Sequence, residues 1–429
     1  MRQHKETTLR SVEEFKTRLL VWAQQFETVV WLDSNQYLQP HSSYDSILAV
    51  DAFTSIQTDA INGFKNLKEY QSITKDWIFG YLSYDLKNDT EPLNSENFDG
   101  LHFPDLYFFQ PKKLFLFKGN TLVTKYLNFV SDEIDDDLES IECISIQQEP
   151  STKNELKIES RISKVSYINK VSTMLSHIHR GDIYEANFCQ EFYANAKLNP
   201  LETYSKLNTI AQTPFATFLK NGDQYLLSSS PERYLKKSGL KIISQPIKGT
   251  TKRSHNLDED LDLKINLESD QKERSENVMI VDLVRNDLSK IAQKGTVKVT
   301  ELCQVHSFKQ VHHMISTVQA TALAGVSAVD IIAATFPMGS MTGAPKISAM
   351  NIIESLEETK RGLYSGAVGY FTPEGDFDFN VVIRSILYNA SKSYISFSVG
   401  SAITSKSTPE KEYEECLVKA KAMRSVLEN

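Results

Sequence analysis

The chain has 429 residues and carries 47 lysines and arginines against 55 aspartates and glutamates, so its formal net charge is −8. Hydrophobic residues make up 41% of the sequence and charged residues 24%, which is typical of a soluble globular protein and excludes a mainly disordered chain. The acidic balance argues against a nucleic-acid-binding protein, and no apolar run approaches the roughly 18 residues that a membrane span needs, so we expect neither nucleic acid nor a membrane as a partner.

The N-terminal segment MRQHKETTLR is polar and lacks the apolar core of a secretory signal. The four cysteines lie far apart with no CxxC pair, so in a chain of this length they are expected to be reduced thiols rather than a disulfide framework. Both features favour a cytoplasmic protein. The four are Cys143, Cys189, Cys303 and Cys416.

The first 130 residues are expected to combine one helix with several strands. Ser11 and Glu14 form a capping-box pattern, and Phe15, Leu19 and Trp22 follow at helical spacing. Strands are predicted over residues 28–33, 47–53, 77–84 and 107–127, the last broken by a hairpin turn at residues 119–120. Residues 131–160, which open with an acidic run, are predicted to be a solvated linker.

From residue 161 onward, helices are predicted over residues 164–180, ended by Gly181, and over residues 257–291. Two further helices are expected to begin at Pro345 and Pro409. Strands are predicted over residues 184–194, 215–228, 240–246, 365–372, 376–388 and 394–404. Because these elements show no regular βαβ alternation, we predict an α+β fold with large, mostly antiparallel sheets packed with helices.

Common catalytic motifs are missing from the sequence. Residues 339–346 (GSMTGAPK) resemble a phosphate-binding loop but lack its GxxxxGK[ST] spacing. His312 and His313 are adjacent, and neighbouring residues of a strand point to opposite faces, so they are not expected to serve one site together.

Two Glu pairs at i, i+3 spacing are the first feature that could carry chemistry: Glu273 with Glu276, and Glu412 with Glu415. On helices this spacing places both carboxylates of a pair on one face. Two such faces opposed across a cleft would form an oxygen-rich site suited to Mg²⁺. Glu pairs are also common on solvated helices, so spacing alone leaves both interpretations open.

Lys248, within residues 246–250 (PIKGT), is the second such feature. It lies between an apolar strand and a Gly-Thr turn, where a lysine could act as a nucleophile or as a charge clamp. To be nucleophilic it must lose its proton, which burial or a cationic neighbour can drive. The alternative is a solvated lysine at the end of a strand.

Taken in order, a set of segments resembles the chorismate-utilising enzyme family, whose members include anthranilate synthase component I, aminodeoxychorismate synthase component I and isochorismate synthases. The resemblance runs from about residue 165 to the C-terminus. Its segments are residues 181–188 (GDIYEANF), 230–233 (SPER), 246–250 (PIKGT), 276–288 (ENVMIVDLVRNDL), 313–316 (HMIS), 339–346 (GSMTGAPK), 364–370 (YSGAVGY), 382–384 (VIR) and 409–415 (PEKEYEE).

The N-terminal part is similar to the family less sharply. Residues 31–35 (WLDSN) resemble the strand that forms a tryptophan pocket in anthranilate synthases, and residues 79–85 (FGYLSYD) resemble the family's N-terminal segment. The resemblance implies a fold of anthranilate synthase component I type, with an N-terminal region over residues 1–150 and a chorismate-binding catalytic domain over residues 151–429. It does not imply feedback inhibition.

Within the family, the residue at position 248 distinguishes members that catalyse different reactions, because anthranilate and isochorismate synthases usually have Ala where this chain has Lys248. The PIKGT form resembles aminodeoxychorismate synthase component I. The resemblance implies that the Lys248 amine adds at C2 of chorismate as the 4-hydroxyl leaves. Ammonia then attacks C4 and expels the lysine, giving 4-amino-4-deoxychorismate for 4-aminobenzoate and folate synthesis. Covalent addition would thus divide one substitution into two allylic displacements.

The remaining roles are carried over position by position. Glu232 matches the general acid that protonates the departing hydroxyl, which requires a partly buried site with a raised pKa. Glu276 and Glu415 match Mg²⁺ ligands, and Glu273 and Glu412 match acidic partners that act through waters. The positions that match the substrate-binding set are Gly249, Thr250, His313, Lys346, Tyr364, Arg384, Gly400, Ser401 and Ala402.

Two parts of the sequence depart from the family pattern. Glu185 stands where aminating members usually have Gln and where isochorismate synthases have a water-activating Lys, so its effect on amination is open. Gly400, Ser401 and Ala402 replace a more Gly-rich segment, which could alter the approach of the backbone to the substrate.

The resemblance leaves two other functions to test: anthranilate synthase component I, against which Lys248 argues, and a non-catalytic chorismate-binding subunit. No cysteine lies in the GxCxG context of a glutaminase nucleophile, and no lyase domain is expected after Asn429. Ammonia derived from glutamine would therefore come from a separate glutaminase subunit, component II.

Overall fold

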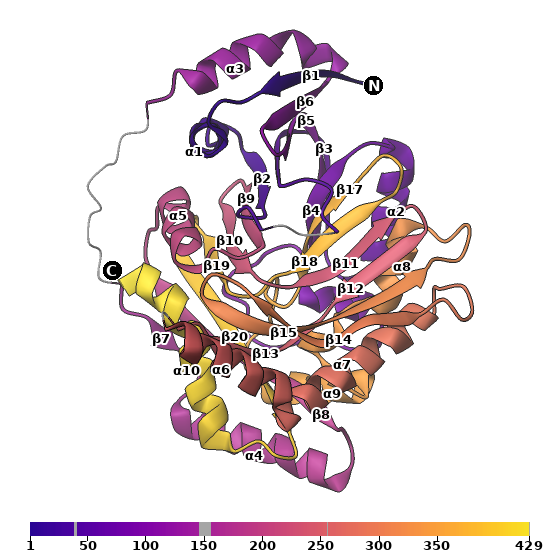
Figure 1. Ribbon diagram of the computed structural model, residues 1–429, viewed down its shortest axis with the longest axis vertical. Helices are drawn as coiled ribbons and strands as arrows, with labels where there is room; N and C mark the ends of the chain where they lie inside the picture. Colours follow the sequence, from indigo (N-terminus) through magenta and orange to yellow (C-terminus); the bar gives the residue numbers. More distant parts are fainter. Residues whose placement is uncertain (38–40, 146–155, 255, 429) are drawn as a thin grey trace.

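The computed structural model describes residues 1–37, 41–145, 156–254 and 256–428 (Figure 1). Among these residues, the strands join into one hydrogen-bonded network of 20 strands. They are β1 (Arg2–Thr8), β2 (Thr28–Asp33), β3 (Ser46–Thr58), β4 (Ile78–Leu82), β5 (Leu106–Lys118), β6 (Thr121–Leu127), β7 (Glu159–Ser160), β8 (Glu185–Asn195), β9 (Phe215–Asn221), β10 (Gln224–Ser230), β11 (Arg233–Ser238), β12 (Lys241–Gln245), β13 (Ile247–Lys252), β14 (Lys298–Ser307), β15 (Val311–Thr321), β16 (Gly343–Ala344), β17 (Ala367–Phe371), β18 (Phe377–Val381), β19 (Ser385–Asn389) and β20 (Tyr394–Thr404).

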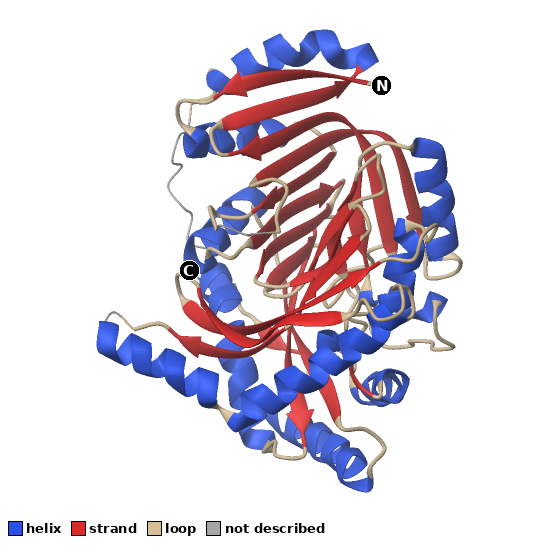
Figure 2. Ribbon diagram, turned by 45° about the vertical axis from the view of Figure 1, so that its right-hand side comes forward, coloured by secondary structure: helices blue, strands red, loops and turns tan. Residues whose placement is uncertain are grey.

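Helices surround the strands (Figure 2). The α-helices are α1 (Val12–Ala23), α2 (Gly63–Thr74), α3 (Ile134–Glu142), α4 (Lys164–Arg180), α5 (Pro200–Ala211), α6 (Leu257–Ser269), α7 (Gln271–Ser289), α8 (Ala328–Thr335), α9 (Lys346–Leu356) and α10 (Pro409–Glu428). Short 3-10 helices are η1 (Tyr84–Asp89), η2 (Asn128–Glu133) and η3 (Gly339–Met341).

Strand β2 shows why the strands form a central layer. Val29 and Trp31 belong to a hydrophobic core that includes α1, whereas Val30 belongs to a second core on the opposite face of the strand. Since successive side chains of a strand alternate between its two faces, β2 buries both of them. The helices therefore cover the outer face, and other strands cover the inner one.

Strands from before and after residue 150 pair directly. β2 pairs with β9, where Trp31 lies opposite Phe218, and β4 pairs with β17, where Gly80 lies opposite Gly369. These pairs and the other strand pairs of the network are antiparallel, as the sequence predicted. The predicted domain boundary at residues 150–151 lies outside the described residues and stays a prediction.

Several predicted elements have the predicted bounds, namely β2, α4 and β20, and the turn at residues 119–120 joins β5 to β6. Gly181 ends α4 with a φ of 88°, a left-handed conformation that favours glycine. The capping box at Ser11 is wrong in its detail: α1 begins there, but the Ser11 side chain caps no backbone N–H.

The predicted linker is also partly wrong. Its acidic run forms η2 and α3 instead of a loop, because Asp137 accepts hydrogen bonds from Lys113 and Tyr126 and so fixes α3 against β5 and β6. The centre of the linker, residues 146–155, lies outside the described residues.

Two long predicted elements are divided in the structure. The helical region 257–291 breaks at Asp270, whose side chain accepts from the backbone N–H groups of Lys272 and Glu273 and thereby starts α7. The strand predicted over residues 376–388 breaks into β18 and β19, and Arg384 in the break has a φ of 53°. Both breaks place residues of the candidate site.

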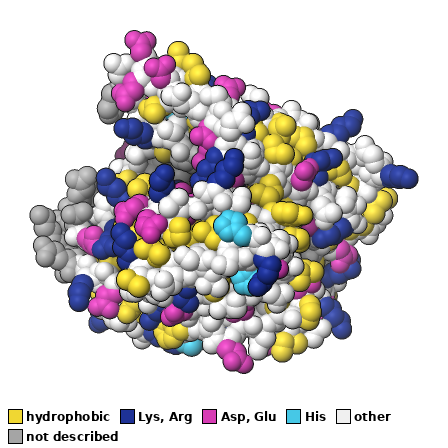
Figure 3. Space-filling model, turned by 90° about the horizontal axis from the view of Figure 1, so that it is seen from below, with side chains coloured by type: hydrophobic (Ala, Val, Ile, Leu, Met, Phe, Trp, Pro, Cys, Tyr) yellow, Lys and Arg dark blue, Asp and Glu magenta, His cyan; other side chains and the backbone are white. Residues whose placement is uncertain are grey.

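No helix of the described residues is long and apolar enough to cross a bilayer. The four cysteines form no disulfide. Lys and Arg side chains are interspersed with Asp and Glu on the face seen from below (Figure 3).

Candidate active site

One cavity of about 530 Å³ collects most of the residues that the sequence predicted for a site. Twelve of the fifteen line it, although they are spread from residue 232 to residue 415. The twelve are Glu232, Lys248, Gly249, Thr250, Glu273, Glu276, His313, Tyr364, Arg384, Gly400, Ala402 and Glu415. The side chains of Ser401, Lys346 and Glu412 do not.

The walls of this cavity come from different parts of the fold. Strands β13, β15 and β20 supply Lys248, His313 and Gly400, and helices α7 and α10 supply Glu276 and Glu415. Helix α7 packs on both β13 and β15, which brings its carboxylates toward the lysine. Arg384 and Glu232 come from the non-regular segments that precede β19 and β11.

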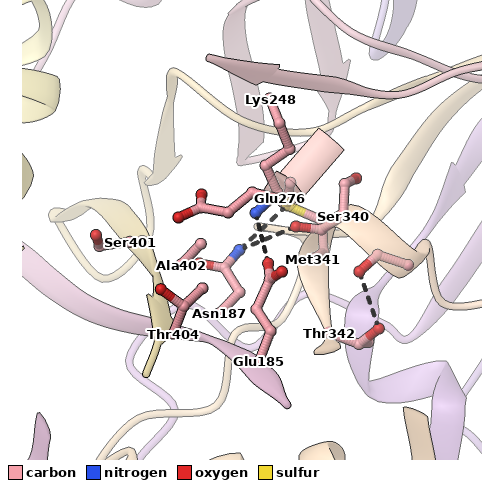
Figure 4. A network of polar contacts seen from close by, with 12 residues as sticks. Glu185, Asn187, Lys248, Glu276, Ser340, Met341, Thr342, Ser401, Ala402 and Thr404 are labelled. Carbon is pink, nitrogen blue, oxygen red and sulfur yellow. Dashed lines mark hydrogen bonds and ion pairs between the residues drawn. The ribbon is translucent and has the colours of Figure 1, made fainter. Parts of the chain in front are cut away.

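Lys248 is a buried cation with one close partner (Figure 4). Its Nζ lies 2.9 Å from Glu185 Oε1, and the two side chains are 12% and 1% exposed. Burial by itself would lower the pKa of Lys248, but Glu185 and Glu276 outweigh it and raise the pKa above its ordinary value. The lysine is therefore an ammonium in this structure, whereas the sequence alone suggested that burial could remove its proton.

Glu232 has the environment expected of a neutral carboxyl group. Its side chain is buried, and its Oε1 accepts a hydrogen bond of 2.7 Å from Ser340 Oγ. Burial raises the pKa of Glu232 to about 7, against smaller opposing effects of Ser340 and Lys248. A carboxyl group with this pKa is available as an acid near neutral pH, as predicted.

Helices α7 and α10 contribute a cluster of carboxylates. Burial raises the pKa of Glu276 to about 7, with Lys248 opposing and Glu185 adding to the shift. Burial also favours a raised pKa at Glu415, but Lys419, whose Nζ lies 2.6 Å from Glu415 Oε1, holds that pKa below its ordinary value. Lys272 Nζ lies 3.8 Å from both Glu276 Oε1 and Glu412 Oε1, so it bridges the two helices.

This cluster fits a magnesium ion that is held from two helices. Within the described part of the chain, no three His, Cys, Asp or Glu side chains stand close enough together to ligate one metal ion. Mg²⁺ does not need such a cage, because it usually binds through one or two carboxylates, several waters and the substrate. Glu276 Oε1 is buried and accepts no hydrogen bond from the residues that the structure describes, its nearest cation being Lys272 Nζ at 3.8 Å, so this carboxylate oxygen could bind a metal ion.

Another part of the wall presents Arg384, His313 and Thr250. Thr250 Oγ1 lies 2.8 Å from His313 Nδ1. Burial, together with a smaller effect of the nearby Arg384, lowers the pKa of His313 to about 3, so the imidazole is neutral. The guanidinium of Arg384 is thus the positive group here, and its forked donors suit a carboxylate.

Two glycines allow the backbone to approach the cavity. Gly249 has a φ of +90°, and a Cβ there would lie 3.2 Å from Glu273 Oε2. A Cβ at Gly400 would lie 2.6 Å from Asn187 Oδ1, which real side chains do not tolerate. Ala402, on the same side of β20 as Gly400, also lines the cavity, whereas the Ser401 hydroxyl points the other way and donates to Glu412.

The position of the Lys346 side chain contradicts the prediction that this side chain binds the substrate. Its ammonium group donates to the Asp287 carboxylate and to the carbonyls of Thr335 and Pro337, at 3.1 and 2.9 Å for the two carbonyls. These three acceptors use all three of its N–H groups. Lys346 therefore fastens the start of α9 to α7 away from the cavity, and it does not line the site.

Glu412 is also displaced from the predicted position. It lies one helical turn before Glu415, buried against Ser401 on the far side of β20, so it does not reach the cavity surface. His312 turns away from His313, as predicted, and its Nε2 lies 3.1 Å from Asp260 Oδ1.

Several residues at this site were not predicted as site residues, among them Lys272, Asn187 and Glu185. Lys272 stands four residues before Glu276, a spacing indistinguishable from an ordinary surface ion pair. Asn187 Nδ2 donates to the carbonyl of Ser340 and lines the cavity. Glu185 was noted in the sequence only as a departure from a family pattern. Its partner Lys248 lies 63 residues away in the sequence, so no local spacing indicated that the two side chains pair.

A second, smaller cavity adjoins the segment that resembles the tryptophan pocket. It is lined in part by Leu32, Asp33 and Ser34 and has a volume of about 60 Å³. That is well below the ~300 Å³ at which small-molecule pockets typically begin. Asp33 is already paired there with Lys16 at 3.2 Å and with the Ser46 hydroxyl at 2.8 Å.

Comparison with known proteins gives this cavity a context. A family model described as chorismate binding enzyme matches residues 27–425. The solved structure of anthranilate synthase component I from Streptococcus pneumoniae TIGR4 superposes with a TM-score of 0.78 at 27% identity, covering 90% of this chain and 94% of that one. The superposition confirms the predicted fold type.

Two curated relatives match at equal identity but have different names. The chain is 33% identical over 360 residues to aminodeoxychorismate synthase component 1 of Bacillus subtilis, covering 81% of this chain and 76% of that protein. It is 33% identical over 363 residues to anthranilate synthase component 1 of Thermus thermophilus, covering 82% and 77%. The chain spans 31% of the length of a probable aminodeoxychorismate synthase of Oryza sativa, which it matches at 40% identity over 282 residues.

Proposed function

The chain belongs to the chorismate-binding enzyme family, and from this premise we propose that it aminates chorismate at C4 with ammonia to give 4-amino-4-deoxychorismate, as aminodeoxychorismate synthase component I. Lys248 is the observation that carries the proposal. A buried lysine lines the cavity beside a carboxyl group whose pKa is about 7. The resemblance assigns Ala to this position in anthranilate and isochorismate synthases, which would leave no nucleophile at C2.

In this proposal Lys248 and Glu232 carry out the first displacement. Lys248 Nζ forms a bond to C2 while the C4–O bond breaks, and Glu232 donates its proton to the departing hydroxyl, which leaves as water. The raised pKa of Glu232 supports this role, because the carboxyl group keeps its proton close to neutral pH. Ammonia then adds at C4, and the bond between C2 and Lys248 breaks.

The carboxylates of α7 and α10 would hold Mg²⁺, with Glu276 and Glu415 as ligands and Glu273 acting through water, whereas Glu412 does not reach the cavity. When bound, the ion would supply positive charge that binds and orients the ring carboxylate. Arg384 and Tyr364 would bind the enolpyruvyl carboxylate. Gly249, Thr250, Gly400, Ser401 and Ala402 would contribute backbone contacts to the substrate. His313 is neutral and would add no charge to this end of the cavity.

Ammonia would come from a glutaminase subunit. The relatives from Bacillus subtilis and Thermus thermophilus are both named component 1, which supports a two-component enzyme. We propose that component II hydrolyses glutamine and passes ammonia to this chain, and that the product supplies 4-aminobenzoate and folate synthesis.

The product made from chorismate tests the proposal. We would incubate the purified chain with chorismate, Mg²⁺ and ammonium chloride and identify the product by chromatography and mass spectrometry. An aminated product that keeps its pyruvate group is expected. Anthranilate as the main product would overturn the proposal and establish the second candidate, anthranilate synthase component I. The identity of 33% to the Thermus thermophilus relative of that name, equal to the identity to the Bacillus subtilis relative, is the reason to test this candidate.

A further inference from the structure

Glu185 is a buried carboxylate for which the proposed reaction has no role. It begins β8, where its backbone lies opposite Ala344 of β16 on one side and Thr404 of β20 on the other. A Cβ at position 343 would lie 2.1 Å from the Glu185 carbonyl oxygen, so β16 reaches this distance only because residue 343 is glycine. The backbone of Glu185 is therefore fixed on both sides, directly behind Lys248.

The side chain of Glu185 has one partner and one unused oxygen. Oε1 accepts from Lys248 Nζ at 2.9 Å, whereas Oε2 is buried and accepts no hydrogen bond from the described residues. An unsatisfied buried carboxylate oxygen is costly unless it serves a purpose. A carboxylate in this state has a free site for a proton.

Lys248 has several acidic neighbours but one acceptor within reach. The carboxylates whose negative charges raise the pKa of Lys248 are Glu185 of β8, Glu276 of α7 and Glu232 before β11. The positive charge of Lys248 in turn acts to lower the pKa of Glu273 and of Glu415. Among the described residues, Glu185 alone receives a hydrogen bond from Nζ. A proton that leaves Lys248 therefore has a direct path to Glu185 Oε1.

The energetics favour transfer within this pair over release to solvent. A buried ion pair loses the hydration of both charges, and its attraction only roughly repays that loss. Moving one proton from ammonium to carboxylate removes both charges at once. Release of the same proton to bulk water would leave the Glu185 carboxylate buried without its partner, which is far more costly.

We propose that Glu185 is the proton acceptor for Lys248: it holds the lysine as an ammonium in the free enzyme and takes one proton as the amine attacks the substrate. This inference rests on the proposed function, because an ammonium has no lone pair with which to attack C2. Glu185 is thus a positioning residue that acts through Lys248 without touching chorismate.

The protons balance over one cycle. One proton passes from Lys248 to Glu185, the Lys248–C2 bond forms as the C4–O bond breaks, and the Glu232 proton leaves in water. Ammonia then forms the C4–N bond, its surplus proton returns to Glu232, and the C2–N bond breaks to release neutral Lys248. Glu185 gives its proton back to Lys248. The sum is chorismate and ammonia in, and 4-amino-4-deoxychorismate and water out.

The test compares Glu185→Gln with Glu185→Asp in the full chain. Gln keeps the size and can accept the hydrogen bond through its amide oxygen, but it cannot take the proton, whereas Asp keeps a carboxylate. Chorismate consumption is measured between about pH 7 and about pH 9 with the free ammonia concentration and the ionic strength held constant. Glu185→Gln is expected to lower kcat about a hundredfold near pH 7, with the KM for chorismate unchanged within about threefold.

The pH slope separates a proton acceptor from a merely structural residue. In Glu185→Gln the lysine proton must leave to solvent, so the ratio of its kcat to the wild-type kcat should rise toward about tenfold per pH unit, whereas the ratio of Glu185→Asp to wild type should stay constant. All three proteins keep Glu232, so the loss of its proton above about pH 7 cancels in these ratios. Parallel profiles for wild type and Glu185→Gln would overturn the inference. Because chorismate consumption is followed whatever the product, and the wild-type product is identified separately, failure of this inference and failure of the proposed function can be told apart.

Discussion

The regions around Lys248 and Lys346 contain the same pair of groups in different surroundings. In each, a lysine side chain that is 12% exposed pairs with a buried carboxylate, Glu185 in one case and Asp287 in the other. Lys346 also donates to two backbone carbonyls, so its donors are all used. Lys248 faces the cavity, and within the described residues its one hydrogen-bond acceptor is Glu185.

The electrostatics of the two lysines differ in direction. Burial lowers the pKa of Lys346 despite Asp287, whereas the carboxylates around Lys248 outweigh burial and raise its pKa. If Lys248 is the nucleophile, as proposed, a lowered pKa does not identify the reactive lysine in this fold. Unused donors beside a cavity, with a proton acceptor behind them, distinguish Lys248 from a lysine that only joins two helices.

The largest expected effect is that of Lys248→Ala. Removing the nucleophile should lower the rate of amination by about a thousandfold or more. Mass spectrometry of protein quenched during turnover should detect a substrate adduct on residue 248 in the wild type and none in the variant. An unchanged amination rate in Lys248→Ala would show that the covalent step is not obligatory.

Lys346→Met should act on stability instead. It leaves Asp287 and two carbonyls buried with fewer donors, so the free energy of unfolding should fall by about 3 kcal/mol. Urea denaturation followed by circular dichroism measures this change. Lys290→Met is the matched control, because Lys290 pairs with the same Asp287 at 3.0 Å from a side chain that is 52% exposed, and it should cost less than about 1 kcal/mol. Equal losses in both variants would contradict the structural role of Lys346.

Glu232→Gln tests the proposed general acid beside Lys248. A Gln cannot supply a proton to the departing hydroxyl, so the rate should fall about a hundredfold. Because the pKa of Glu232 is raised to about 7, the protonated fraction falls as pH rises through that value, and wild-type activity should decline on the alkaline side. The variant should lack this decline in its pH–rate profile. An identical decline in the variant would assign the titration to another group.

Lys272→Met is expected to have the smallest effect. Its ammonium stands between Glu276 and Glu412 and repels an incoming cation, so its removal should lower the Mg²⁺ concentration for half-saturation about fivefold. Titration with Mn²⁺ by electron paramagnetic resonance measures binding without turnover. Lys294→Met, at an exposed position after α7, is the control and should leave affinity unchanged. Weaker binding in Lys272→Met would mean that this lysine orders the carboxylates instead of competing with the ion.

Local patterns predicted the elements that depend on neighbouring residues. The apolar spacing of α4 and its terminal Gly181 gave correct bounds, and β2 and β20 were found from their composition. Helix α5 was missed although Asn199 and Pro200 signal its start, since the Asn199 side chain caps the helix and Pro occupies its first turn. Residues 376–388 were predicted as one strand because nothing local to Arg384 marks its left-handed backbone.

The sequence by itself determined part of the secondary structure, the ordered motifs and the fold type, and it named twelve residues that line one cavity. Tertiary structure alone decided that Lys248 pairs with Glu185 and that Lys346 donates to Asp287 and two backbone carbonyls. It also decided that Glu412 is hydrogen-bonded to Ser401 and does not line the cavity. The physical reason is that secondary structure follows from contacts within a few residues, whereas the charge state and the free donors of a side chain depend on which distant groups are packed and desolvated around it.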